Sequence, residues 1–244
     1  MVKNPYIIVQ ARMNSERLPG KVMKEIADKP LIGILLERLS KSQIPIILAT
    51  STNSENDTLV DYVSKKGIKV YRGSEDNVLE RFYEAAKSVN ADVIIRATGD
   101  NPLIDGNLIK KAYEKYVSYN DMRCCLSIGL SKSYPLGISA TFFSFELLEE
   151  AYENASLPGE FEHVTPYISN NMPGNIRVIP FGGEINKFHY RLTVDNEEDF
   201  ELNKVLIQEY NCAEASIYDI VNILDSNPEL ASINSGIRQK KWDD

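Results

Sequence analysis

At 244 residues the chain is long enough to bury a full hydrophobic core in one α/β domain of moderate size. Hydrophobic residues make up 43% and charged residues 25%, a composition that excludes a disordered chain or a fibrous repeat. The 27 basic and 35 acidic residues give a formal net charge of −8, which disfavours a nucleic-acid partner and requires any phosphate site to be a local arrangement of basic groups.

The cysteines and the lengths of the apolar runs indicate in which cellular compartment the protein is expected. Cys124, Cys125 and Cys212 show neither a disulfide framework nor the spacing of a zinc site. The N-terminus lacks a signal-peptide pattern, and no apolar run reaches the roughly 20 residues that span a bilayer. We therefore expect a cytoplasmic protein without membrane insertion.

In the first part of the chain, short β-rich runs alternate with helix-like segments. Alternation of this kind predicts βαβ units and a parallel sheet. The apolar residues Leu31, Ile34, Leu35 and Leu39 recur at helical spacing, as expected of a helix that covers such a sheet. The β-rich runs are Tyr6 to Val9, Pro45 to Ala49, Lys69 to Tyr71 and Asp92 to Arg96.

After a predicted helix from Asp105 to about Tyr119, the alternation becomes irregular. We predict one domain over residues 1–244 and allow for a small protruding subregion around residues 120–190. The predicted strands here cover residues 123–127, 139–143, 177–180 and 189–194. The predicted helices include residues 145–152, 160–169, 196–210 and, as the last, 217–224.

The segment Gln10 to Lys21, QARMNSERLPGK, places three cations directly after the first predicted strand. Ligands of open α/β sheets bind at this edge, beyond the carboxyl ends of the strands. Arg12 and Arg17 offer planar forks of donors to phosphate oxygens, and Lys21 supplies a compact charge. The segment matches neither the Walker pattern nor GxGxxG. It is interpreted as a triphosphate-binding loop, with a solvated basic loop as the alternative.

Two aspartates follow predicted strands, Asp100 after the run 92–96 and Asp195 after the run 189–194. Carboxylate oxygens are the ligands that Mg²⁺ prefers, and Mg²⁺ is commonly held by one or two carboxylates together with substrate phosphates. Asp195 alone could equally be a helix N-cap. As a pair, the two aspartates predict metal-assisted phosphoryl chemistry.

Several motifs together resemble one family. The chain looks like the cytidylyltransferase superfamily that includes CMP-ketodeoxyoctonate and CMP-sialate synthetases, and most of all like its spore-coat-polysaccharide SpsF-like branch. The resemblance extends from the first strand to about Leu202. The motifs are QARMNSERLPGK, LATS at 48–51, RGSEDNVLERFYEAA at 72–86, TGDNPLID, EHVTPYI and RLTVDNEEDFEL.

The resemblance implies a Rossmann-like nucleotide-diphospho-sugar transferase fold, with a mostly parallel central sheet flanked by helices. It implies that CTP binds over the first loop, that Mg²⁺ is held by Asp100 and Asp195, and that Lys21 joins them in catalysis. A homodimer is common among such proteins. The expected nucleotide-binding residues are Ala11, Arg12, Asn14, Ser15, Arg17, Lys21, Arg72, Arg81 and Thr98.

One segment departs from the pattern of the resembled branch. Where that branch carries an acidic pair in a segment like PxGLDVEVFS, residues 134–144 read YPLGISATFFS, with Ser139 and Thr141 in the acidic places. This difference predicts an altered acceptor pocket or an altered outer shell of the metal, or else a weakened catalyst. His163 and Arg191 complete the expected acceptor-binding set, although a structural role for His163 is the alternative.

The sequence therefore predicts an Mg²⁺-dependent nucleotidyltransferase. It would transfer CMP from CTP to an acidic or phosphorylated sugar-like acceptor and release pyrophosphate, for surface polysaccharide biosynthesis. Two alternatives stay open. One is a glycosyltransferase of the GT-A type, although its usual DxD motif is lacking near Asp100, where the sequence reads Asp-Asn-Pro. The other is a non-catalytic nucleotide-binding subunit.

Overall fold

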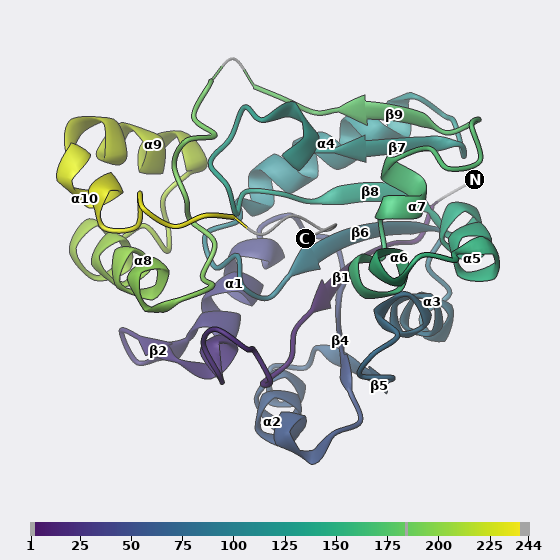
Figure 1. The fold of residues 1–244 in the computed structure, drawn as a ribbon, viewed down its shortest axis with the longest axis horizontal. Coiled ribbons are helices and arrows are strands. Elements are labelled where there is room, and N and C mark those ends of the chain that lie inside the picture. Colours follow the sequence, from purple (N-terminus) through teal and green to yellow (C-terminus); the bar gives the residue numbers. More distant parts are fainter. Residues whose placement is uncertain (1–2, 184, 240–244) are drawn as a thin grey trace.

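A seven-stranded sheet runs through the centre of the computed structural model, which describes residues 3–183 and 185–239 (Figure 1). Its strand order is β5-β4-β1-β6-β8-β7-β9. Only β8 runs antiparallel to its two neighbours, so the mostly parallel sheet predicted from the sequence is confirmed. The strands are β1 (Pro5–Gln10), β4 (Ile46–Ser51), β5 (Lys69–Gly73), β6 (Val93–Thr98), β7 (Cys124–Ser127), β8 (Thr141–Ser144) and β9 (Arg177–Pro180).

Both faces of the sheet are covered by helices, which is why Ile7, Ile8 and Val9 of the central strand are all fully buried. One hydrophobic cluster joins the sheet to α1 (Leu31–Ser40), α2 (Asp57–Lys65), α4 (Gly106–Ser118), α8 (Glu197–Tyr210), α9 (Ile217–Ser226) and α10 (Pro228–Ser232). The cluster on the other face involves α3 (Val78–Ser88), α5 (Phe145–Asn154), α6 (Pro158–His163) and α7 (Pro166–Ser169). In Figure 1 the yellow and green α8, α9 and α10 gather at one end of the molecule.

Shorter elements complete the chain. They are the hairpin β2 (Glu25–Ile26) and β3 (Lys29–Pro30), and the 3₁₀ turns η1 (Lys21–Met23), η2 (Ser54–Asn56) and η3 (Gly129–Ser131). None of the helices in the described ranges is long and apolar enough to cross a membrane.

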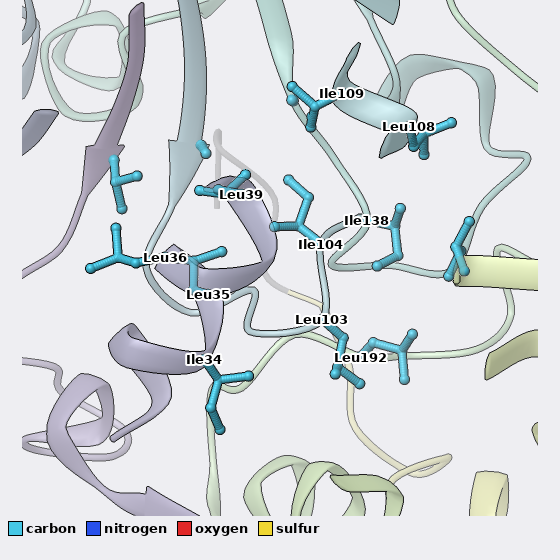
Figure 2. Packing of buried hydrophobic residues seen from close by; sticks show 14 of the residues in the cluster. Ile34, Leu35, Leu36, Leu39, Leu103, Ile104, Leu108, Ile109, Ile138 and Leu192 are labelled. Atoms are coloured by element: carbon cyan, nitrogen blue, oxygen red, sulfur yellow. The ribbon is translucent and has the colours of Figure 1, made fainter. Parts of the chain in front are cut away.

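Packing on the α1 face fixes the segments that carry the two aspartates. Figure 2 shows side chains of α1 and α4 gathered with Leu103 and Ile104, which follow β6, and with Leu192. Leu103, Ile104 and Leu192 are each at most 1% exposed. Each such side chain contributes about 1.5–3 kcal/mol on burial, so the backbone near Asp100 and Asp195 is firmly held.

Three local predictions differ from the structure. The helix predicted over 160–169 is broken into α6 and α7, because Val164 has φ 66° and Pro166 starts a new helix. The strand predicted over 189–194 is reduced to a single bridge between Leu136 and Arg191. The last predicted helix is followed by a further one, α10.

Candidate active site

The loop after β1 is folded back on itself by backbone contacts. The Met13 amide donates to Asn56 Oδ1 at 2.9 Å, and the Met13 carbonyl accepts from the amides of Ser15 and Gly20 at 3.0 and 2.8 Å. Gly20 has φ 70°, a conformation that glycine adopts without strain. The loop therefore ends by directing Lys21 into the protein, where it is only 9% exposed.

Lys21 lies between the two aspartates predicted to be catalytic. Its Nζ is 3.2 Å from Asp100 Oδ2, 3.0 Å from Asp195 Oδ1 and 2.7 Å from the Val194 carbonyl oxygen. The three residues come from the loop after β1, the loop after β6 and the segment before α8. The predicted convergence of Lys21, Asp100 and Asp195 at one edge of the sheet is thus present in the structure.

Asp195 is surrounded by cations. Besides Lys21, Arg17 Nη2 lies 2.9 Å from its Oδ1 and Arg191 Nη2 lies 2.7 Å from its Oδ2. Burial by itself would raise the pKa of Asp195, but Lys21, Arg17 and Arg191 lower it below its usual value. The carboxyl is therefore ionised at neutral pH. Asp195 is not the helix cap, because Asn196 accepts the Asp199 amide at the start of α8.

The loop that carries Asp100 is pressed against the first loop. A Cβ at Gly99 would lie 2.6 Å from the Ala11 Cβ, so glycine is required there, and the Gly99 amide donates to Gln10 O at 2.7 Å. Thr98 Oγ1 donates to Asp100 Oδ1 at 2.6 Å and orients the carboxylate. Among the predicted nucleotide-binding residues, Ala11 and Thr98 therefore lie beside the Lys21 cluster.

Arg191, predicted to bind the acceptor, is engaged inside the protein. Its Nε and Nη2 lie 2.8 and 3.0 Å from the carboxylate of Asp199, and its Nη1 donates to Gln239. Asp199 is fully buried and also accepts from Asn234 and from the Asp195 amide. Sequence reasoning missed Asp199 and Asn234, since a helical aspartate and a distant asparagine carry no local signal. Arg191 thus contacts Asp195 directly, and its acceptor role stays a prediction.

The remaining predicted nucleotide-binding arginines differ in how free their donors are. Arg12 pairs with Glu75 at 2.6 Å. Arg72 pairs with Asp57 and donates to three carbonyls at the end of β4, so it braces that turn. Arg81 is 1% exposed, and its Nε and Nη2 have no hydrogen-bond partner in the described part of the chain. Asn14 is exposed and Ser15 half-buried at the tip of the first loop.

The predicted acceptor residues Ser139, Thr141 and His163 are all half-buried. Thr141 on β8 lies directly opposite Arg96 on β6 and 3.4 Å, oxygen to oxygen, from the Ser127 hydroxyl. Burial lowers the pKa of His163, Glu162 opposes that shift, and the charge of Arg96 adds to it. Thr141 is thus adjacent to Arg96, and His163 lies within range of the charge of Arg96. Ser139 packs toward Gly129.

The carboxylates of Asp100 and Asp195 lie close enough together to share one cation. Within the described residues, no three His, Cys, Asp or Glu side chains gather as a complete metal site. Asp100 and Asp195, however, both contact the same ammonium group, which stands in for a cation between two hard oxygen donors. Such a pair matches a metal that is completed by substrate phosphates and water, as Mg²⁺ commonly is.

Comparisons with known proteins identify the family of the chain. Residues 6–218 match the model of the cytidylyltransferase family. The chain is 39% identical to an uncharacterised protein of Methanocaldococcus jannaschii, over 96% of each chain. It is 35% identical to the spore coat polysaccharide biosynthesis protein SpsF of Bacillus subtilis, over 92% of this chain and 95% of that protein.

Solved structures show the same fold. A cytidylyltransferase from Leptospira borgpetersenii superposes with a TM-score of 0.87 at 30% identity, covering 98% of this chain and all of that one. A CMP-2-keto-3-deoxy-manno-octonic acid synthetase complexed with CTP superposes with a TM-score of 0.62 at 18% identity, over 84% of this chain and 99% of that one. Family model and full-length relatives lead to one conclusion: the chain belongs to the cytidylyltransferase family.

Proposed function

We propose that the protein is an Mg²⁺-dependent enzyme that transfers CMP from CTP to an acidic or phosphorylated sugar-like acceptor and releases pyrophosphate. The observation that carries this proposal is the convergence of Lys21, Asp100 and Asp195 beside a loop that also brings Arg12 and Arg17. Membership of the cytidylyltransferase family favours this function over the GT-A alternative. A role in surface polysaccharide biosynthesis is supported by the likeness to SpsF.

The bond changes are those of a single displacement. An acceptor oxygen forms a bond to the α-phosphorus of CTP, and the bond from that phosphorus to the bridging oxygen breaks. The electron pair leaves with pyrophosphate, and the proton of the attacking acceptor hydroxyl passes to solvent water. No covalent intermediate with the protein is required, so the protein acts by positioning and by electrostatic stabilisation.

The residues of the first loop supply the positive charge that the triphosphate needs. Lys21 and Arg17 are both held by Asp195, and Arg12 by Glu75, so each cation is positioned before substrate arrives. Phosphate oxygens would take over these contacts, since charge-assisted bonds to phosphate are strong and an arginine fork matches phosphate geometry. The overall charge of −8 makes these local cations the source of attraction for CTP.

Asp100 and Asp195 would hold Mg²⁺, which when bound neutralises charge on the phosphates and polarises the phosphorus–oxygen bond. Thr98 keeps the Asp100 carboxylate in orientation, and Arg191 does the same for Asp195. The two carboxylates belong to backbone segments joined by the bond from the Val194 amide to Asp100 O, at 2.8 Å. Their separation is therefore fixed by the fold.

The experiment is a screen of pyrophosphate release. The protein is incubated with each of the four nucleoside triphosphates, with and without Mg²⁺, and with a panel of sugar acids and sugar phosphates. Release that depends on CTP, Mg²⁺ and one class of acceptor supports the proposal. CTP binding without turnover on any acceptor would favour the non-catalytic alternative. Sugar transfer from a nucleotide sugar would favour the glycosyltransferase alternative. A homodimer stays a prediction for sedimentation analysis.

A further inference from the structure

Arg96 is a half-buried charged residue on a central strand of the sheet. It lies on β6, between Ile8 of β1 and Thr141 of β8. Alternation along β6 places its side chain on the face of Ile94, which packs in the cluster under α3 and α5. A charge in such a position is costly unless partner groups compensate for the lost water. The partners of Arg96 therefore decide what it can do.

In the part of the chain that the structure describes, the Arg96 guanidinium has fewer hydrogen-bond partners than it has N–H donors. Arg96 Nη2 donates to Gln10 Oε1 at 3.2 Å, and its Nε is buried with no hydrogen-bond partner in residues 3–183 and 185–239. Over the same residues no carboxylate forms an ion pair with it. Burial lowers the pKa of Arg96 to about 10, partly offset by Asp100. A guanidinium has five N–H donors and one neutral amide oxygen satisfies little of that capacity, so an anion is the fitting partner.

The groups beside Arg96 are hydrogen-bonding groups suited to an anion. Thr141 is its cross-strand partner, and Ser127 is in turn the partner of Thr141, so the three side chains share one face of the sheet. The two hydroxyls are 3.4 Å apart. His163, at the end of α6, lies within range of the charge of Arg96, which lowers its pKa. One cation and two hydroxyls thus lie on one face of the sheet, and an imidazole lies within electrostatic range of the cation.

The backbone next to His163 is strained. Val164 has φ 66° and ψ −52°, and the Thr165 amide donates to the His163 carbonyl at 2.7 Å, which closes a tight γ-turn. A β-branched residue in this region costs about 1–3 kcal/mol and persists only where its surroundings hold it. Val164 is fully buried, so packing imposes the turn and fixes the end of α6. Such strain gathers at functional sites.

We propose that Arg96, with Ser127 and Thr141, forms an anion subsite near His163 that binds the carboxylate or phosphate group of the acceptor. The attribution to the acceptor rests on the proposed function. It follows from position, because Arg12 and Arg72 lie on the side of β4 and β5, whereas Arg96 faces β8 on the other side of β1. Arg96 is therefore separate from Arg12 and Arg72, while Lys21 and Arg17 lie at the carboxyl edge of the sheet beside Asp100 and Asp195.

The direct test uses His163 as a reporter of anion binding. The sequence has two histidines, so in a His189→Gln background the His163 imidazole gives the single histidine signal in an NMR spectrum. Sodium acetate and sodium phosphate are titrated separately into CTP-free and CTP-loaded protein. We expect a saturable shift with at least one anion, and an affinity lower by about tenfold or more in Arg96→Met. Arg96→Lys should recover part of it.

A matched control and a kinetic readout complete the design. Arg123→Met removes an arginine that is already paired with Glu150, outside the subsite, and should bind the anions like the parent protein. With an active acceptor, Arg96→Met should raise the acceptor KM and leave the CTP KM unchanged. A response to acetate alone assigns a carboxylate, a response to phosphate alone assigns a phosphate, and a response to both supports the shared subsite.

Three results would overturn the subsite. They are equal anion affinity in the parent and Arg96→Met, no saturable response of the parent to either anion, or a rise in the CTP KM as large as that in the acceptor KM. Failure of CTP to bind or to react would instead contradict the proposed function. The titration of CTP-free protein tests the subsite in either case, and a urea unfolding curve shows that each variant is folded.

Discussion

Two groups of cations balance their charges differently. In the first group, Lys21 lies between Asp100 and Asp195 at the carboxyl edge of the sheet, and Arg12 is paired with Glu75 toward β4 and β5. On the side of β6 and β8, Arg96 has an amide partner and no ion pair within the described residues. A paired cation must exchange its carboxylate for a phosphate, whereas a half-buried cation with few partners gains directly from an arriving anion. We call the region of Lys21 and Arg12 the exchange side, because its cations must exchange a carboxylate partner for a phosphate. We call the region of Arg96 the capture side, because Arg96 can bind an arriving anion directly.

The largest effect is expected on the exchange side, for Asp100→Ala. The change removes a proposed Mg²⁺ ligand and one partner of Lys21, so kcat should fall by about 10³-fold, the size seen when a charge-stabilising group is lost. The fold should persist, because the Asp100 side chain is 28% exposed and its carbonyl still accepts from Val194. Pyrophosphate release measures kcat, and a urea unfolding curve measures the stability of the fold. Unchanged Mg²⁺-dependent turnover would refute the metal assignment.

Arg191→Met tests how much the buried ion pair between Arg191 and Asp199, which lies next to Asp195, stabilises the fold. It leaves the fully buried Asp199 without its charged partner, and breaking a buried pair costs about 3–5 kcal/mol. Urea unfolding measures the loss of stability. Arg123→Met is the matched control, because its pair with Glu150 is partly exposed and should contribute no more than about 1 kcal/mol. Equal losses of unfolding free energy in the two variants would show that the buried Arg191–Asp199 pair stabilises the protein no more than a partly exposed ion pair does.

Lys21→Ala and Arg12→Ala test whether the paired cations bind the triphosphate. Each should weaken CTP binding by about tenfold in calorimetry, because one charge-assisted contact is lost. Glu75→Gln is the control, because it removes the anionic partner of Arg12 and keeps the cation. This variant should bind CTP as tightly as the parent protein or more tightly. Wild-type affinity in both alanine variants would instead favour the solvated-loop interpretation.

The double change Ser139→Asp with Thr141→Glu would make the capture side resemble the exchange side. A glutamate opposite Arg96 could pair with it, and both new charges would repel an acidic acceptor. The acceptor KM should rise by about tenfold while CTP binding stays nearly unchanged. Turnover of the acidic acceptor at the wild-type rate, with both residues shown to line the pocket, would contradict this account of specificity.

The smallest effect concerns acid stability. Burial raises the pKa of Glu75, but hydrogen bonds from Ser51 and Arg12 lower it below its ordinary value. A carboxyl whose pKa is lower in the folded state adds stability above its unfolded pKa of about 4.3, and that stability is lost as the pH falls through the folded value. In Arg12→Ala the loss between pH 5 and pH 3 should be shallower, by less than about 1 kcal/mol. Unfolding free energies across this range would show identical pH slopes if the pair contributes nothing.

Much of the fold and part of the candidate site could be predicted from local pattern. The alternation of β-rich runs and amphipathic helices predicted the parallel strands, because each element carries its own periodicity. The rule that ligands bind beyond the carboxyl ends of strands placed Lys21 and Asp100 at one edge of the sheet, and the resemblance implied that Asp195 joins them. The run before Asp195 forms only the bridge at Arg191, so tertiary packing brings Asp195 to that edge. The break at Val164 was missed, since nothing in the residues around it demands a positive φ.

The sequence by itself determined which residues carry charge, which segments form strands, and hence which loops share an edge of the sheet. Only the tertiary structure decided which charges are satisfied. Arg72 and Arg96 look alike in sequence, yet Arg72 is engaged by Asp57 and the turn after β4, and Arg96 has one amide partner among the residues that the structure describes. The reason is that hydrogen-bond partners come from segments far apart in the chain, such as Gln10 for Arg96 and Asn234 for Asp199, and local periodicity carries no information about them.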